Sequence, residues 1–335
     1  MGYTDENGVE LDLSSSGRGF QQILLLLSYM YANPNTILLL DEPDAHLEIL
    51  RQRHIYRILS DIAEEQKCQL ITASHSEVIL NEAADRDVVV AFVGRPHRID
   101  DRVSQVLKSL KEIGFDQYYQ AEQTGWVLYL EGSTDLAMLQ RLAAKLNHPA
   151  QRVLDRPFVH YVDNKPSSAE SHFYGLREAK SNLVGVGIFD RLDKILPDYG
   201  ALRLTMWSKR ELENYFVDED TLLSFIVRDL VTGDLFGVAE IDRRQNIMRE
   251  AISRVSEALE TLGKPAPWSD DIKVTDDFLD LVFVRYYKEL GQPNLMRKTD
   301  YHVLVDSYPT GKLSAEISQK LDLILDVANT SKPAQ

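Results

Sequence analysis

The sequence predicts an α/β protein built from two successive units, each with a parallel sheet. Short, wholly apolar segments such as Ile37–Leu40 have the composition of strands that a parallel sheet buries on both faces. Segments with helical periodicity separate these strands along the chain, which favours parallel pairing through crossovers. Several strands end at acidic residues, among them Glu131 and Asp190, and this places carboxylates at the edge where open α/β sheets bind ligands.

The first unit is predicted to span residues 1–105. Its expected strands are Ile37–Leu40, Gln69–Ala73 and Val88–Val93. Its expected helices are Phe20–Tyr31, Leu47–Gln66 and Ser76–Ala84. A polar connector at 106–123 follows, with a helical stretch near Ser104–Ile113.

The second unit has a predicted α/β core at 124–220, a helical insertion at 221–300 and a closing segment at 301–330. Its expected strands are Val127–Leu130, Phe158–Val162, Val184–Phe189 and Leu202–Trp207. Its expected helices are Asp135–Asn147, Ala169–Asn182 and Gly311–Val327, with further helices between Thr221 and Glu289.

Composition narrows the classes of protein that the chain can belong to. No apolar run of the 335 residues is long enough to span a bilayer, and the single cysteine, Cys68, cannot form an internal disulfide. We therefore expect a cytoplasmic protein that is not embedded in a membrane. The net charge of −15 disfavours nucleic acid as a partner, although clustered carboxylates recruit cations that reverse the local sign.

The first unit carries a pattern typical of nucleotide hydrolysis. Ile37-Leu-Leu-Leu-Asp41-Glu42-Pro43 is an apolar strand that ends in two acids, as a Walker B motif does. Asp41 would hold Mg²⁺ and Glu42 would polarise the attacking water. His75 follows the next strand at the position of an H-switch, and Asp44-Ala-His46-Leu47 resembles a D-loop. Ser16 and Gly17, before a helix, resemble the signature loop, where an anion site is reasonable.

These four elements, in this order, resemble the C-terminal lobe of an ABC-type ATPase of the RecF, Rad50 and SMC kind. The sequence contains no G-x-x-x-x-G-K-[ST] loop to bind the β- and γ-phosphates. We therefore predict negligible ATP hydrolysis by this chain alone, with ATP used only if a missing N-terminal portion or a partner chain supplies the Walker A loop.

The second unit carries a pattern typical of divalent-metal phosphate chemistry. Glu131-Gly-Ser-Thr-Asp135 predicts a strand, a tight turn at Gly132 and a helix capped by Ser133 or Thr134. Asp190 and Asp193 follow a later strand, and Glu211 and Glu213 follow the last one. Carboxylates that converge from successive strand ends can hold one or two Mg²⁺ or Mn²⁺ ions for in-line attack on a phosphodiester.

These motifs resemble TOPRIM domains, particularly those of OLD-family nucleases, which join an ABC-type ATPase to a C-terminal TOPRIM nuclease. The resemblance implies an ABC ATPase sheet, partial here, followed by a TOPRIM domain with a helical insertion. It implies metal ligands, with Glu131 also on the general acid/base side. The implied ligands are Glu131, Asp135, Asp190, Asp193, Glu211 and Glu213. Lys312, in Tyr308-Pro-Thr-Gly-Lys312, would stabilise charge near the scissile phosphate.

One position departs from the family pattern. The family usually reads D-R-D-D where this chain reads Asp190-Arg191-Leu192-Asp193, so that Leu192 replaces the second acid of D-x-D. We expect Asp193 to serve instead if the chain has left the strand by that position. Taken singly, each of these acids is more simply a helix cap or a surface residue, and only their joint placement favours a metal site.

The predicted function is a Mg²⁺- or Mn²⁺-dependent DNA endonuclease, associated with an incomplete ATPase module. The resemblance further implies defence against phage, DNA as the substrate and homodimer formation. Topoisomerase and primase chemistry stay open. So do two non-enzymatic alternatives: a DNA-binding or defence-complex subunit with a degenerate TOPRIM site, and a scaffolding fragment of an ATPase.

Overall fold

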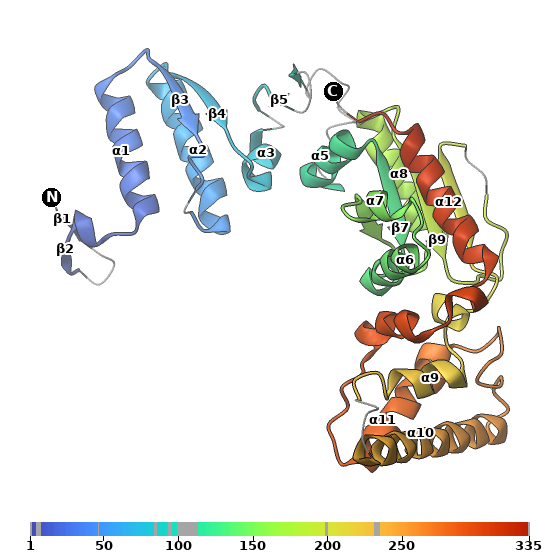
Figure 1. Cartoon of the computed structure of the whole chain (residues 1–335). Helices are drawn as coiled ribbons and strands as arrows, with labels where there is room; N and C mark the ends of the chain where they lie inside the picture. The colour runs from blue at the N-terminus through green and yellow to red at the C-terminus, as the bar shows by residue number, and fades with distance from the viewer. Residues whose placement is uncertain are drawn as a thin grey trace. The chain divides into compact units, whose positions relative to one another are not determined.

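A computed structural model describes residues 2–4, 8–45, 47–83, 86–92, 96–98, 113–197, 200–230 and 235–333. The chain forms two compact units, residues 1–119 and 120–334, and each is described by itself (Figure 1). The division falls within the predicted connector, inside helix α5 (Phe115–Thr124). Most of the helical stretch predicted near Ser104–Ile113, and His46 of the predicted D-loop, lie outside the described residues.

The first unit is built around a parallel pair of strands, as its sequence predicts. Strands β3 (Ile37–Asp41) and β4 (Gln69–Ala73) pair in register from Ile37–Gln69 to Asp41–Ala73. The helices of this unit are α1 (Arg18–Ala32), α2 (Ile49–Glu65) and α3 (Glu77–Ala83). Strands β1 (Gly2–Thr4) and β2 (Glu10–Asp12) form an antiparallel pair, and the short helix η1 (Leu13–Ser15) follows them.

The two faces of the β3–β4 pair differ in burial. Leu38 is only 7% exposed and packs with Met30 of α1 and Leu59 of α2. The neighbouring Leu39 is 76% exposed, because successive side chains of a strand point to opposite faces. Ile37 and Ile71 are each 60% exposed on the same side as Leu39. The first unit therefore has an apolar sheet face that the described residues leave uncovered.

A strand does form within Val88–Val93, but it is shorter than predicted and does not join the parallel sheet. The structure has a two-residue strand, β5 (Val90–Ala91), which pairs antiparallel with β6 (His97–Arg98). Strands as close in the chain as β5 and β6 pair readily in the antiparallel direction.

The second unit contains a four-stranded parallel sheet with the strand order β10-β9-β7-β8. Its strands are β7 (Trp126–Leu130), β8 (Val159–Tyr161), β9 (Val184–Phe189) and β10 (Leu202–Met206). All three pairings are parallel, and all five residues of β7 are buried, as expected for a central strand. The α/β fold class predicted from the sequence is confirmed.

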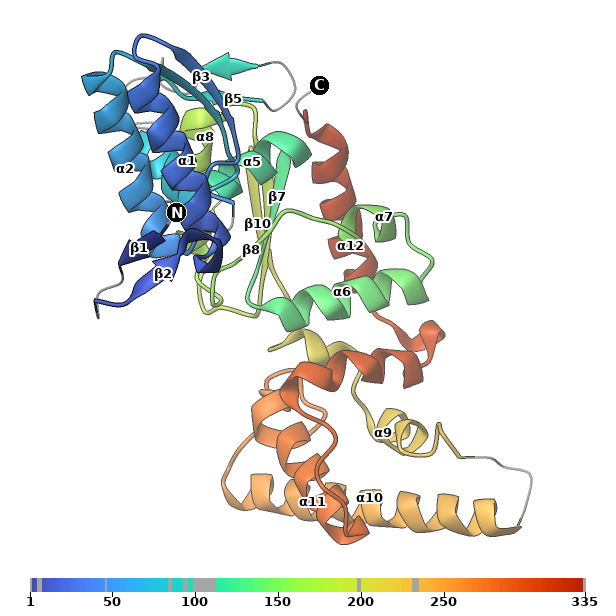
Figure 2. The same ribbon diagram turned by 90° about the vertical axis from the view of Figure 1, so that its left-hand side faces the viewer.

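Helices cover both faces of this sheet, as Figure 2 shows. Helices α6 (Ser133–Lys145) and α12 (Ala315–Thr330) contact one another and pack on β7, while α8 (Pro166–Ala179) contacts β9 and β10. Gly185 of β9 permits the close approach of α8, because a Cβ there would lie 2.9 Å from the ring of Phe173. The short helix α7 (Gln151–Leu154) lies against α6.

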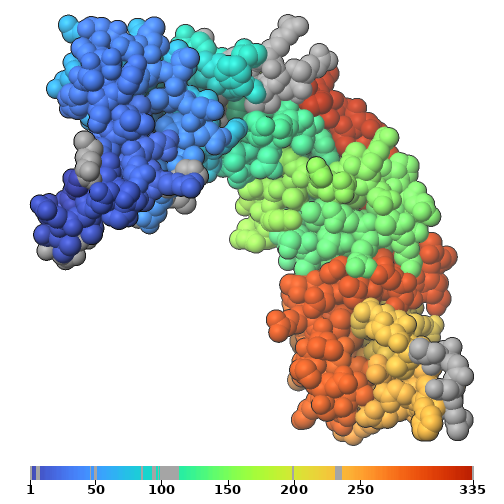
Figure 3. All heavy atoms as spheres, turned by 60° about the vertical axis from the view of Figure 1, so that its left-hand side comes forward, coloured from blue at the N-terminus to red at the C-terminus, as the bar shows by residue number. Residues whose placement is uncertain are grey.

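The segment predicted as a helical insertion is largely helical and belongs to the second unit, where Figure 3 shows it in yellow to orange. Its elements are α9 (Glu219–Phe225), α10 (Leu235–Thr261), the π-helical turn η3 (Val274–Leu279) and α11 (Asp280–Leu290). The 3₁₀ segment η4 (Lys298–Ser307) follows and contacts α6 and α9. One continuous hydrophobic core joins the sheet, the insertion and α12.

The last helix begins later than the sequence suggested. Thr310–Lys312 is a separate 3₁₀ turn, η5, and α12 starts at Ala315 with Ser314 as its N-cap. The Ser314 hydroxyl accepts a hydrogen bond from Glu316 N at 3.2 Å, which satisfies a backbone donor that the helix itself cannot pair. No helix among the described residues is both long and apolar enough to cross a membrane.

Candidate functional site

The two acids that first suggested a site lie at the carboxyl ends of neighbouring strands. Glu131 directly follows β7 and Asp190 directly follows β9, and these strands are paired from Trp126–Val184 to Tyr129–Gly187. The chain runs from β7 outward to β8 on one side and returns to β9 on the other. Glu131 and Asp190 therefore lie at the topological switch point, where open parallel sheets bind their ligands.

Asp135 is fixed beside Glu131 by the start of helix α6. Its Oδ2 accepts a hydrogen bond from Gly132 N at 3.1 Å, so Asp135 caps the helix. The prediction that Ser133 or Thr134 caps it is therefore wrong. Gly132 is extended (φ −152°, ψ 179°), and a Cβ there would meet only Thr134 Oγ1, at 3.8 Å. The turn does not require a glycine, contrary to expectation.

Glu211 and Glu213 belong to a short segment after β10 that contains the 3₁₀ turn η2 (Leu212–Tyr215). Both side chains are buried, which is rare for glutamate unless a partner compensates the charge. Glu211 Oε2 accepts a hydrogen bond from Thr275 N at 3.1 Å. A backbone amide of the insertion therefore contacts a carboxylate of the sheet domain.

The carboxylates of this region are close enough to perturb one another. Burial, together with the charge of nearby carboxylates, raises the pKa of Asp190 to about 9. Those carboxylates belong to Glu213, Glu131, Asp135 and Glu211. Burial likewise raises the pKa of Glu213 to about 8 and that of Asp135 to about 6. A bound cation would relieve this repulsion, because it stabilises the ionised form of every carboxylate around it.

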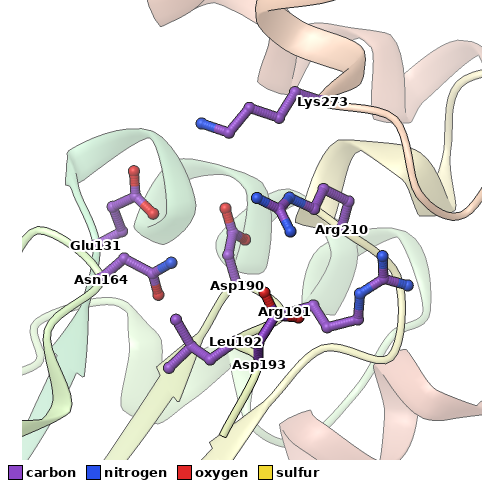
Figure 4. A pocket seen from close by; sticks show the side chains of 8 residues that line it. All are labelled: Glu131, Asn164, Asp190, Arg191, Leu192, Asp193, Arg210 and Lys273. Carbon is purple, nitrogen blue, oxygen red and sulfur yellow. The ribbon is translucent and has the colours of Figure 1, made fainter. Parts of the chain in front are cut away.

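A cavity of about 250 Å³ opens beside Asp190 (Figure 4). Its lining residues are Glu131, Asn164, Asp190, Arg191, Leu192, Asp193, Arg210 and Lys273. Figure 4 shows the carboxylates of Glu131 and Asp190 on one side of the cavity, with Lys273 and Arg210 reaching in from the other side. Asp193 is exposed and lines the same cavity as Leu192.

Two buried oxygen atoms near these carboxylates lack a hydrogen-bond partner. Across the described parts of the chain, only Asn164 Oδ1 and Thr275 Oγ1 are buried side-chain polar atoms without one. Asn164 lines the cavity, and the backbone of Thr275 binds Glu211. Unpaired buried oxygens are uncommon, and both are atoms that a hard cation or its bound water could satisfy.

The donor atoms fit Mg²⁺ or Mn²⁺ chemically, since all are carboxylate, amide or hydroxyl oxygens. The side chains are not preassembled as ligands, however. No group of three or more His, Cys, Asp or Glu side chains within the described ranges has a spacing that could hold a metal ion. A cation would therefore have to draw the carboxylates inward, while Asp135 and Glu211 stay hydrogen-bonded to backbone amides.

Lys312 lies apart from the cavity lining. Its Nζ is 3.3 Å from Asp220 Oδ2 and 3.7 Å from Asp218 Oδ2, at the start of helix α9. The cations that do line the cavity are Arg191, Arg210 and Lys273. Sequence reasoning missed Asn164 and Lys273, although the polar run Asp163-Asn164-Lys165 after β8 was a usable sign of a ligand loop.

The predicted nucleotide residues of the first unit fall into two groups. Asp41 ends β3, Glu42 follows it, and His75 Nε2 lies 3.3 Å from Glu42 Oε1, so the ends of β3 and β4 bring these side chains together. Ser16 and Gly17 stand before helix α1, where the Ser16 hydroxyl donates to Leu13 O at 2.7 Å. Among the described residues, no hydrogen bond or ion pair joins the two groups.

Comparisons with known proteins concern the N-terminal part of the chain. Residues 1–81 match the family model described as "AAA domain, putative AbiEii toxin, Type IV TA system". The dipeptide transport ATP-binding protein DppD of Caldanaerobacter subterraneus subsp. tengcongensis is 32% identical over 84 residues. That match covers 25% of this chain and 24% of the relative. These findings indicate an AAA-type ATPase domain, related to ABC ATPases, at the N-terminus.

Proposed function

We propose that the second unit is a divalent-cation-dependent nuclease that hydrolyses phosphodiester bonds of DNA at a TOPRIM-type site. One observation carries the proposal: five carboxylates from three separate segments lie near the switch point of a parallel sheet, and four of them raise the pKa of the fifth, Asp190. Such a cluster of carboxylates is unfavourable without bound cations. Titratable groups with strongly shifted pKa values occur in proteins mostly at functional sites. The two unpartnered oxygens beside it support the same conclusion.

The side chains divide naturally into two sets of ligands. Glu131, Asp135 and Asp190 would hold one cation, and Glu211 with Glu213 would hold another. Bound there, Mg²⁺ or Mn²⁺ would stabilise charge on a phosphate and supply a nucleophilic hydroxide near neutral pH. Asp193 stands at the same cavity and could replace the carboxylate that the family carries at the position of Leu192.

The chain's own groups supply the remaining requirements of hydrolysis. Glu131 is exposed at the cavity and can accept a proton from an attacking water. Asp135 is held in place by Gly132 N, and Glu211 by Thr275 N, so both carboxylates are oriented before substrate arrives. The apolar core beneath the strands excludes water from one side of the site.

A plasmid-nicking assay tests this proposal. Wild-type protein should nick supercoiled DNA with Mg²⁺ or Mn²⁺ and not with EDTA, and Glu131→Ala should abolish nicking. Asp326→Asn, which alters an exposed carboxylate of α12, should cut as the wild type does. Cleavage that persists in EDTA or in the Glu131→Ala protein refutes the mechanism. Intact DNA that is bound but uncut favours the alternative, a non-catalytic DNA-binding or defence-complex subunit.

For the first unit we infer a contribution to ATP hydrolysis that this sequence does not complete. The N-terminal match supports nucleotide binding, and Glu42 with His75 lies where a catalytic pair would act. The sequence has no Walker A loop, so the prediction of negligible turnover by the chain alone stands to be tested. Robust ATPase activity that Glu42→Gln abolishes would overturn it. Sedimentation with and without ATP would test the predicted homodimer.

A further inference from the structure

The cavity beside Asp190 contains cations that the metal site alone does not explain. Lys273 and Arg210 reach it from the side opposite Glu131 and Asp190 (Figure 4). A cluster of carboxylates in a chain of net charge −15 repels a polyanion, so any phosphate that enters must meet compensating positive charge. These two side chains are placed to provide it.

The third cation of the cavity, Arg191, is already engaged. Its guanidinium lies 2.5 Å from Asp271 Oδ1 and donates to Ser208 O at 3.3 Å, and it points away from the cavity centre (Figure 4). Arg210 forms no ion pair with any described residue although it is half-buried. Within the described part of the chain, Lys273 forms one ion pair, with Asp276 at 3.8 Å between Nζ and Oδ2. Arg210 and Lys273 therefore retain donors for a ligand.

The segment that carries Lys273 is tied firmly to the sheet domain. Lys209 Nζ lies 3.0 Å from Asp270 Oδ1, and Arg210 N donates to Asp270 O at 2.8 Å. The Asn214 amide donates to Ser269 O at 3.1 Å and to Ile272 O at 3.2 Å. The segment Ser269–Thr275 is thus fixed at both edges, which holds the Lys273 backbone above the cavity.

We infer that Arg210 and Lys273 form the phosphate-binding half of the site, which grips the non-bridging oxygens of a nucleic-acid phosphodiester. This inference rests on the proposed function and gives the helical insertion a direct role in binding substrate. Arg210 offers a planar fork of donors that matches phosphate oxygens, and Lys273 adds a point charge from a second segment. Arg210 directly precedes Glu211 in the chain, whereas Lys273 comes from the distant insertion.

The test measures DNA binding apart from cleavage. A fluorescein-labelled DNA duplex or single strand is titrated with full-length Glu131→Gln protein in Mn²⁺, and its fluorescence anisotropy is measured. The same titration is repeated with Glu131→Gln proteins that carry Arg210→Gln or Lys273→Gln as a second substitution. Each added change should weaken binding about tenfold and lower the slope of log Kd against log salt by about 1. Lys288→Gln removes the same charge from an exposed site on α11 and should leave both quantities unchanged.

Two further measurements keep the result interpretable. Lys273→Arg should retain most binding, and Lys273→Gln should bind Mn²⁺ in calorimetry within about twofold of its parent. If the protein with Glu131 intact binds DNA but does not nick it, the proposed nuclease activity is refuted. The phosphate-binding role of Arg210 and Lys273 is not refuted by that result. If the protein nicks DNA in a metal-dependent way but Lys273→Gln, Arg210→Gln and Lys288→Gln all bind DNA with the same affinity, the phosphate-binding role of Arg210 and Lys273 is refuted. The nuclease proposal then still stands. A complete lack of DNA binding refutes both.

Discussion

Thr275 N donates a hydrogen bond to Glu211 Oε2 at 3.1 Å, across 64 positions of the chain. This bond joins the π-helical turn of the insertion to a buried carboxylate after the last strand. Because Glu211 accepts this bond and Glu213 lies two residues further along the chain, the insertion forms part of the candidate site. Folding of the insertion and affinity for a divalent cation should therefore be coupled.

The stability of the cation-free protein should fall as the pH rises. Asp190 and Glu213 have pKa values of about 9 and about 8 in the folded protein, against about 3.9 and 4.3 in an unfolded chain. Between these limits the folded state binds more protons than the unfolded state, so the free energy of unfolding decreases with pH. Denaturation in EDTA from pH 5 to pH 9 should show this, and Asp190→Asn should flatten the curve.

Added Mn²⁺ should oppose that loss, because a cation favours the ionised carboxylates and displaces their protons. The rise in Tm caused by Mn²⁺ should therefore be larger at pH 8 than at pH 6. An equal rise at both pH values would contradict the assignment of the raised pKa values to a cation site.

Two buried threonines should respond in opposite ways to replacement by valine. Thr275 Oγ1 has no hydrogen-bond partner, so Thr275→Val removes a buried unpaired hydroxyl and should stabilise the cation-free protein by about 1 kcal/mol. Thr221 Oγ1 donates to Asp218 Oδ1 at 2.6 Å, so Thr221→Val should destabilise by about 1 kcal/mol. Urea denaturation in EDTA measures both. Equal destabilisation would show that Thr275 Oγ1 is satisfied in solution.

Glu316 should position the acidic segment from a distance. At the start of α12 its carboxylate accepts hydrogen bonds from Ser208 N, from the Ser208 hydroxyl and from the Tyr215 hydroxyl. These bonds clamp the ends of the segment that carries Glu211 and Glu213. Glu316→Ala should cost about 2 kcal/mol of unfolding free energy and weaken Mn²⁺ binding, as followed by denaturation and calorimetry.

Glu316→Gln keeps one acceptor oxygen, so it should lose less unfolding free energy and less Mn²⁺ affinity than Glu316→Ala. Asp326→Asn, on the same helix and exposed, provides the control. Unchanged Mn²⁺ affinity in a folded Glu316→Ala protein would mean that Glu316 supports the fold without positioning the acids.

The uncovered face of the β3–β4 pair should govern self-association more than stability. Leu39 is 76% exposed, so Leu39→Glu should change the free energy of unfolding by less than about 0.5 kcal/mol while reducing aggregation measured by light scattering. Leu38→Ala, on the opposite face, should cost about 2–5 kcal/mol because Leu38 is buried. Strong destabilisation by Leu39→Glu would show that another part of the protein covers this face.

The positions of most strands followed from local pattern. Apolar runs such as Trp126–Leu130 and Val184–Phe189 are bounded by polar or turn residues, so their ends could be located to within a residue or two. The same pattern placed Glu131 and Asp190 at strand ends. Helix starts were less accurate, because Asp135 and Ser314 make capping contacts that spacing alone does not rank.

By itself the sequence determined the α/β class and the acids that end its strands, since alternation and strand termination are properties of neighbouring residues. Only the tertiary structure decided the strand order, which sets Glu131 beside Asp190, and the return of the insertion, which brings Thr275 to Glu211 and Lys273 to the cavity. Contacts over such separations depend on how whole elements pack, and a single sequence carries no local trace of them.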